Sequence, residues 1–140
     1  MWRELTEDDL VATLSRKEVD AYRNDFEIDP VPTLLAETTA WARGYIRTNG
    51  NVRMDPNERT LPESVISPAM DYVAIKILKR LNIEPKEIRK QARTDAISYF
   101  EQIASGKVNP EGFGELPQDD SEMSVTAPAF SDPRPARLLD

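Results

Sequence analysis

Two runs of carboxylates are the side chains that could do acid–base or metal chemistry in this sequence. One is Glu-Asp-Asp at 7–9, and the other comprises Asp119, Asp120 and Glu122. The first run falls where a helix is expected to begin, and acidic residues there stabilise the helix because they interact favourably with its dipole. The second run lacks the spacing of a calcium-binding loop and fits an acidic linker better. Neither run predicts a catalytic or metal site.

The sequence contains no cysteine and no histidine. This composition excludes disulfides, Cys/His zinc sites, thiol nucleophiles and an imidazole base. It also contains no glycine-rich phosphate loop and no nucleophile elbow. We therefore expect a protein that is not an enzyme and that uses no cofactor.

Two groups of residues are candidates for binding rather than catalysis. Trp41 and Tyr45 could stack on nucleic acid bases, but their helical spacing favours a place in the core. Arg53, Met54 and Arg59 lie in the long polar stretch NGNVRMDPNERTLPE at 49–63. Arginines in such a loop could meet phosphates or a partner's carboxylates, or the loop could simply be solvated.

Length and charge indicate one acidic domain with a tail. The chain has 140 residues, 39% hydrophobic and 31% charged, and a net charge of -7. Residues 115–140 contribute -4 of this charge, and residues 1–114 contribute -3. We expect no basic patch that would grip nucleic acid. No apolar run is long enough for a membrane span and the start has no signal-peptide core, so we expect a cytosolic protein.

Capping sequences predict the first two helices. Thr6 with Asp9, and Ser15 with Glu18, each have the spacing of a capping box. We expect short helices over 7–13 and 16–23, followed by a break at Pro30 and Pro32.

Hydrophobic periodicity predicts three longer helices, over 33–48, from a cap at Ser67-Pro68 to residue 81, and over 86–104. Ile88 belongs to the apolar stripe of the predicted helix 86–104. Arg43 and Arg47 lie off the apolar stripe of helix 33–48, on a face expected to be exposed.

No segment shows the alternating pattern of a β-strand. The prediction is an all-α bundle of about five helices over 1–109, with a long polar loop and an extended Pro-rich acidic arm at 110–140. The expected core includes Trp41, Tyr45, Val73, Ile77, Leu78, Tyr99, Phe100 and Ile103.

The end of the chain, SVTAPAFSDPRPARLLD, combines prolines with apolar and basic residues. These are anchor types for an extended peptide that lies on another protein. The alternative is a terminus without a partner. The candidate anchors are Val125, Pro128, Phe130, Arg134, Arg137, Leu138 and Leu139.

Three stretches carry a resemblance to a known family. They are LTEDDLVATLS, SPAMDYVAIKILKRL and IRKQARTDAISYFEQIASGKVNP. Together, over about residues 4–110, they resemble the head–tail connector proteins of tailed bacteriophages, the adaptor or head-completion proteins of Mu-like and siphophage type. The family offers no catalytic residues, and its pattern does not include the C-terminal arm.

The resemblance implies a small helical bundle that forms a ring, usually of twelve copies, beneath the portal of the DNA-filled head. Such a ring extends the DNA channel and docks a stopper or tail-completion protein. It implies a place in the virion neck after assembly in the host cytoplasm. Loop 49–63 would face the lumen or the next ring, and the arm would reach the portal or a neighbouring copy. The alternative is a small acidic helical module that binds or regulates one protein partner.

Overall fold

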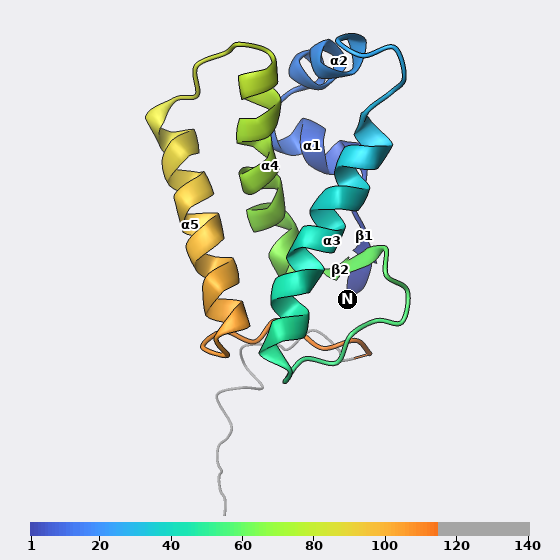
Figure 1. Cartoon of the computed structure of the whole chain (residues 1–140), viewed down its shortest axis with the longest axis vertical. Helices are drawn as coiled ribbons and strands as arrows, with labels where there is room; N and C mark the ends of the chain where they lie inside the picture. Colours follow the sequence, from blue (N-terminus) through green and yellow to red (C-terminus); the bar gives the residue numbers. More distant parts are fainter. Residues whose placement is uncertain (115–140) are drawn as a thin grey trace, which may run out of the picture.

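The computed structural model describes residues 1–114 and contains five α-helices (Figure 1). A two-stranded antiparallel sheet pairs the start of the chain with a segment in front of the fourth helix. The all-α prediction is confirmed, because this sheet is very small. The elements are β1 (Trp2–Glu4), α1 (Glu7–Thr13), α2 (Arg16–Asn24), α3 (Val31–Asn49), β2 (Thr60–Pro62), a 3₁₀ turn (Glu63–Val65), α4 (Ile66–Arg80) and α5 (Glu87–Ala104).

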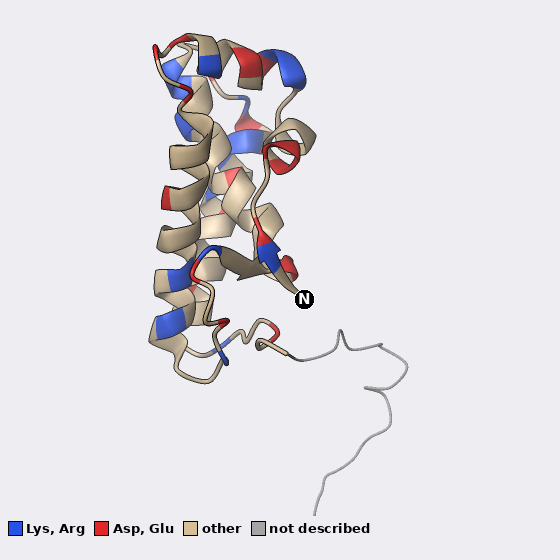
Figure 2. Cartoon of the chain, turned by 90° about the vertical axis from the view of Figure 1, so that its right-hand side faces the viewer, with Lys and Arg blue, Asp and Glu red and all other residues tan. Residues whose placement is uncertain are grey.

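The three long helices form the body, and α1 and α2 cover one of its ends. α4 lies between α5 and the side that carries α1, α2 and β1 (Figure 1). Figure 2 looks onto that side and shows acidic residues interspersed with basic residues. The largest fully buried side chains come from every long helix and from α1, and include Leu10, Ile46, Met70, Ile77, Phe100 and Ile103. One continuous core therefore holds the body together.

The predicted caps explain why the short helices begin where they do. The Asp9 carboxylate accepts a hydrogen bond from the backbone N–H of Thr6 (2.8 Å). The Ser15 hydroxyl accepts one from the N–H of Glu18 (3.1 Å). Each bond satisfies a donor that the first turn of a helix leaves free. Helices α1 and α2 begin one residue after these caps, as predicted.

The predicted core residues divide into two groups. Val73, Ile77, Leu78, Phe100 and Ile103 are buried, whereas Trp41, Tyr45 and Tyr99 are half-buried at the edge of the core. Trp41 stacks on Tyr72 at 3.9 Å between ring centroids and meets the edge of Phe100 at 4.8 Å. Large aromatic side chains often keep one edge in water while the rest of the ring packs.

Four local predictions were wrong. The strands were missed because three-residue strands show no alternation that periodicity could detect. α3 begins at Val31, two residues early, because Pro32 in the first turn loses no required N–H. α4 begins at Ile66 after a 3₁₀ turn, so Ser67 is not its cap. Ile88 is 77% exposed, because it lies at the start of α5.

Candidate functional site

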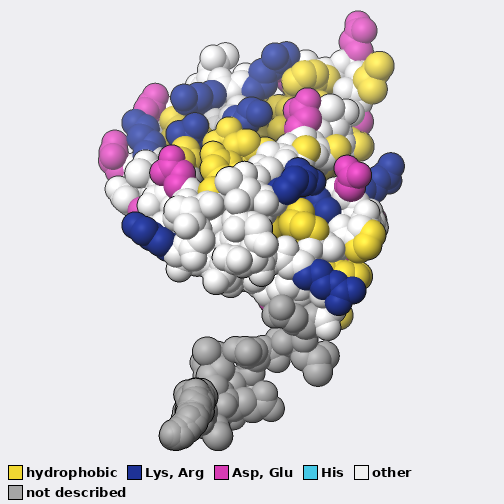
Figure 3. Space-filling model, turned by 60° about the horizontal axis from the view of Figure 1, so that its bottom comes forward, with side chains coloured by type: hydrophobic (Ala, Val, Ile, Leu, Met, Phe, Trp, Pro, Cys, Tyr) yellow, Lys and Arg dark blue, Asp and Glu magenta, His cyan; other side chains and the backbone are white. Residues whose placement is uncertain are grey.

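Three segments far apart in the sequence meet at one end of the body (Figure 1). We call this the loop end: residues 1–4, 50–63 and 106–114. Backbone bonds join the segments, from Glu63 N–H to the Met1 oxygen (2.9 Å) and from Phe113 N–H to the Arg53 oxygen (2.7 Å). The Trp2 indole N–H donates to the Glu111 oxygen (3.0 Å). In Figure 3, where this end comes forward, basic and hydrophobic side chains lie close together on the surface.

Arg43 is the residue that holds the loop between α3 and β2. Its guanidinium donates to the backbone oxygens of Asp55 (2.7 Å), Asn57 (3.1 Å) and Thr60 (2.8 Å). It also lies over the Trp2 ring at 5.5 Å. Arg43 is only 3% exposed, so the prediction of an exposed position was wrong for Arg43, whereas Arg47 is exposed as expected. Burial lowers the pKa of Arg43, but a guanidinium remains a cation because its ordinary pKa is so high.

The loop also holds itself through side chains. The Asp55 carboxylate accepts from the backbone N–H of Asn57 (2.9 Å) and from the hydroxyl of Thr60 (2.6 Å). The hydrogen bond from the Thr60 hydroxyl lowers the pKa of Asp55. Burial raises this pKa, but the bond from the Asn57 N–H and the charge of Arg43 lower it further, so the pKa lies below its ordinary value. The loop is therefore built as a fixed turn around Arg43.

Asn49 fastens the end of α3 to the end of α5. Its side-chain amide donates to the Ile103 oxygen (2.7 Å) and to the Asn109 side chain (2.8 Å). Gly50 then takes the left-handed conformation, with φ of 77°, that ends the helix. The last residue of α3 is thus also a link between two helices.

The structure separates the loop residues singled out in the sequence. Arg53 is exposed and its guanidinium lies 6.0 Å from the Phe113 ring. Met54 is half-buried against the core. Arg59 is exposed and lines a groove beside β1 and the start of α3. Arg53 and Arg59 therefore lie in different surroundings.

The predicted arm begins at residue 110, but its first residues pack on the body. Pro110 is buried, and Phe113 meets the edge of the Trp2 ring at 6.5 Å. The Glu111 carboxylate accepts a hydrogen bond from the Ser64 hydroxyl and pairs with the Met1 amino group (3.5 Å). The candidate anchors Val125, Pro128, Phe130, Arg134, Arg137, Leu138 and Leu139 lie outside the described residues.

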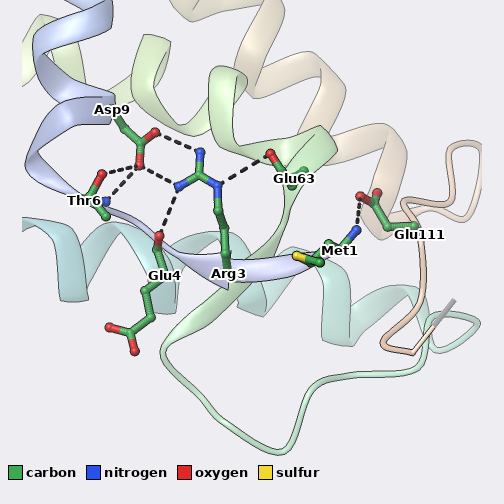
Figure 4. Close-up of polar contacts among 7 residues, drawn as sticks. All are labelled: Met1, Arg3, Glu4, Thr6, Asp9, Glu63 and Glu111. Carbon is green, nitrogen blue, oxygen red and sulfur yellow. Dashed lines mark hydrogen bonds and ion pairs between the residues drawn. The ribbon is translucent and has the colours of Figure 1, made fainter. Parts of the chain in front are cut away.

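An ion pair next to the loop end predicts a pH dependence of stability. Arg3 donates to both oxygens of Asp9 (2.9 and 3.0 Å) and reaches Glu63 (3.5 Å) (Figure 4). Burial raises the pKa of Asp9, but hydrogen bonds from Arg3 and Thr6 outweigh this effect and leave the pKa below its ordinary value. A lowered carboxyl pKa stabilises the fold above the unfolded pKa, and this stability is lost as the pH falls through the folded pKa.

We therefore expect Asp9→Asn to be less stable than the natural chain at neutral pH. The difference should shrink as the pH falls below about 4, because the carboxyl is then protonated first in the unfolded chain and, below its lowered folded pKa, in the native chain as well. Urea unfolding at a series of pH values measures it. Asp8→Asn is the control, because the Asp8 side chain is 92% exposed. A pH-independent difference would contradict the assignment.

The low net charge conceals a basic segment. Residues 76–93 contain seven Lys and Arg residues and two Glu residues, a net charge of +5. They form the end of α4, the connection to α5 and the first two turns of α5. A charge total over the whole domain does not reveal this segment, since it averages opposite charges.

Comparison of the chain with protein-family models, with curated proteins and with solved structures finds no match. Among residues 1–114, no group of three or more acidic residues is placed to hold a metal ion. No helix in the described part of the chain is both long enough and apolar enough to cross a membrane.

Proposed function

We propose that this chain is a structural protein of the virion, an adaptor that forms a ring beneath the portal of a tailed phage. The ring extends the DNA channel and docks the stopper or tail. The stretches that carry the resemblance correspond to α1 with the N-cap residue of α2, to α4, and to α5 with the turn after it. Each resembling stretch is thus a helical element of the bundle.

The observation that carries the proposal is the loop end built around Arg43. A docking surface binds more tightly when its loops are already in the bound conformation, because less entropy is lost on association. The three bonds from Arg43 and the internal bonds of Asp55 hold such a loop in the free chain. Arg53 stands exposed on this end and is available to a partner's carboxylates.

The overall charge suits a DNA conduit. A net charge of -7 on each copy, repeated around a ring, repels the phosphates of passing DNA and disfavours tight binding. DNA would pass through the ring without a specific site. This role needs neither a cofactor nor a metal ion.

Particle composition tests the proposal. Mass spectrometry of gradient-purified particles of the phage that encodes the chain should detect it at about the copy number of the portal, as cyclic symmetry requires. A nonsense mutation in its gene should give DNA-filled heads and separate tails by electron microscopy. Particles that lack the chain, or that join normally without it, would overturn the proposal.

A second candidate is a small acidic module that binds or regulates a basic protein. The observation in its favour is the acidity of residues 1–29, where nine acidic and four basic residues give a net charge of -5. A chain that is absent from particles, stays monomeric and ignores purified portal would support this function instead.

A further inference from the structure

The hairpin at the end of the body away from the loop end presents apolar side chains to solvent. We call residues 75–94 the basic hairpin. Ile83 is 42% exposed and Ile88 is 77% exposed. Ile83 lines two grooves of about 600 and 560 Å³ that share Ile83, Glu84 and Pro85, and Ile88 lines the second of them. Exposed apolar side chains beside grooves, rimmed by charge, are typical of a protein-binding surface.

Most cations of the basic hairpin already have partners within the chain. Lys90 pairs with Glu84 at 2.9 Å, and Arg80 pairs with Asp25 at 2.6 Å. Arg89 donates to a backbone oxygen at the end of α1, and Arg93 lies over an aromatic ring of α4. Within residues 1–114, the cations of the hairpin that make no such contact are Lys76, Lys79 and Lys86.

Two of these lysines, Lys79 and Lys86, border the grooves beside the exposed isoleucines, and this combination favours a protein partner over nucleic acid. A DNA-binding surface gains its affinity from many phosphate contacts, each made by a cation that is available. Its contacts are polar, so exposed isoleucines contribute little there. On a protein partner, the same isoleucines would bury apolar area while the lysines select an acidic rim.

A surface with the complementary features lies on the same chain. A groove of about 500 Å³ is lined by apolar side chains of α3 and by Leu5, and four carboxylates line it as well. We call it the acidic groove. Glu4 and Glu58 make no ion pair among residues 1–114, whereas Glu7 and Asp29 are paired with Arg23. One cation, the exposed Arg59, also lines the groove, whose full lining is Glu4, Leu5, Glu7, Asp29, Val31, Pro32, Leu35, Ala36, Thr39, Glu58 and Arg59.

The two surfaces are on opposite sides of the body. The start of α5 forms one edge in Figure 1, and β1 with the start of α3 forms the other. Figure 2 looks onto the side with the acidic groove. Two different, complementary patches on one chain make a head-to-tail contact, and copies joined in this way form a closed ring if the rotation allows it.

We propose that the basic hairpin of one copy docks in the acidic groove of the next copy. Ile83 and Ile88 pack on the apolar wall of the groove, and Lys79 and Lys86 meet Glu4 and Glu58. The occupant is a second copy because the charges that line the two surfaces are complementary: Lys79 and Lys86 border the grooves of the basic hairpin, whereas four carboxylates and one arginine, a net charge of -3, line the acidic groove. This inference rests on the proposed ring and identifies the surfaces that close it.

Cysteine cross-linking tests the contact, because the natural chain contains no cysteine. Ile88→Cys and Ala36→Cys place one thiol on each surface, and both positions are exposed. Mixed single variants of the full-length chain should form a disulfide-linked dimer under mild oxidation, and the double variant should form a ladder of higher oligomers. The matched control replaces Ala36→Cys with Thr48→Cys, which is exposed at the far end of α3. The test pair should link at least about tenfold faster than this control.

Three outcomes would overturn the inference. Equal rates for test and control pairs would exclude this contact. Preferential linking of Ile88→Cys to Phe130→Cys would identify the C-terminal segment as the occupant. Protection of Ile88→Cys by a short DNA duplex at physiological salt would identify nucleic acid. If mass spectrometry finds the chain in particles but cross-linking gives one of these results, the adaptor function stands and only the proposed contact surfaces are wrong. If the chain is absent from particles, the adaptor function itself is wrong.

Discussion

Replacing Arg43 with methionine is expected to lower the free energy of unfolding by about 3 kcal/mol or more. The three backbone oxygens that its guanidinium satisfies would be left without donors, and each unsatisfied buried acceptor costs about 1–3 kcal/mol. Methionine keeps most of the apolar stem, so the loss would report on hydrogen bonds rather than on packing. A domain of this size has about 5–15 kcal/mol of stability, so the variant should still fold.

The same helix supplies a matched control. Arg47 lies one turn after Arg43 and is exposed, so Arg47→Met should change stability by no more than about 0.5 kcal/mol. Urea unfolding measures both variants, and hydrogen exchange should show faster exchange in residues 50–60 for Arg43→Met alone. Equal stability of the two variants would mean that the loop does not depend on Arg43.

Arg43→Lys separates charge from geometry. Lysine keeps the positive charge, but all of its N–H donors are on one nitrogen. The guanidinium donates to the three backbone oxygens from two nitrogens that are held in a fixed planar geometry. We expect Arg43→Lys to recover only part of the stability that Arg43→Met loses. Full recovery would show that charge alone holds the loop.

The role of Arg43 could not be predicted from the sequence, for a physical reason. Periodicity places apolar residues on the buried face of a helix and assigns the remaining positions to solvent. Arg43 occupies one of those remaining positions, and its partners are backbone oxygens of residues 12 to 17 positions later. Backbone acceptors carry no side-chain signal. The one indication in the sequence is the length of the loop, because a long loop with a fixed conformation requires side-chain contacts that stabilise it.

Local chemistry, in contrast, was predictable. The caps at Thr6 and Ser15 and the left-handed glycines Gly50 and Gly106 act within a few residues, so their positions determine where helices begin and end. The pairing of β1 with β2 joins residues about sixty positions apart and was missed. The two charged surfaces were missed as well, because opposite charges cancel in a total that covers the whole chain.

Replacing Phe100 with alanine is expected to lower the free energy of unfolding by about 3–5 kcal/mol. Phe100 is 0% exposed, and its ring meets those of Trp41, Tyr45 and Tyr99 at 4.8, 5.6 and 5.9 Å. The substitution would leave a cavity where three aromatic rings converge, and well-packed surroundings refill such a cavity only in part. Urea unfolding measures the loss, and near-UV circular dichroism should show that Trp41 has changed its environment.

Ile88→Ala is the matched control, on the same helix. Because Ile88 is 77% exposed, its loss should change stability by no more than about 0.5 kcal/mol. Phe100→Leu, which fills part of the cavity, should lose an amount of stability between those of Phe100→Ala and Ile88→Ala.

Phe100→Ala and Ile88→Ala also separate two roles of apolar residues on α5. If Phe100 holds the fold and Ile88 holds the neighbouring copy, Ile88→Ala should weaken assembly while unfolding is unchanged. A loss of stability at Ile88 equal to that at Phe100 would contradict this division.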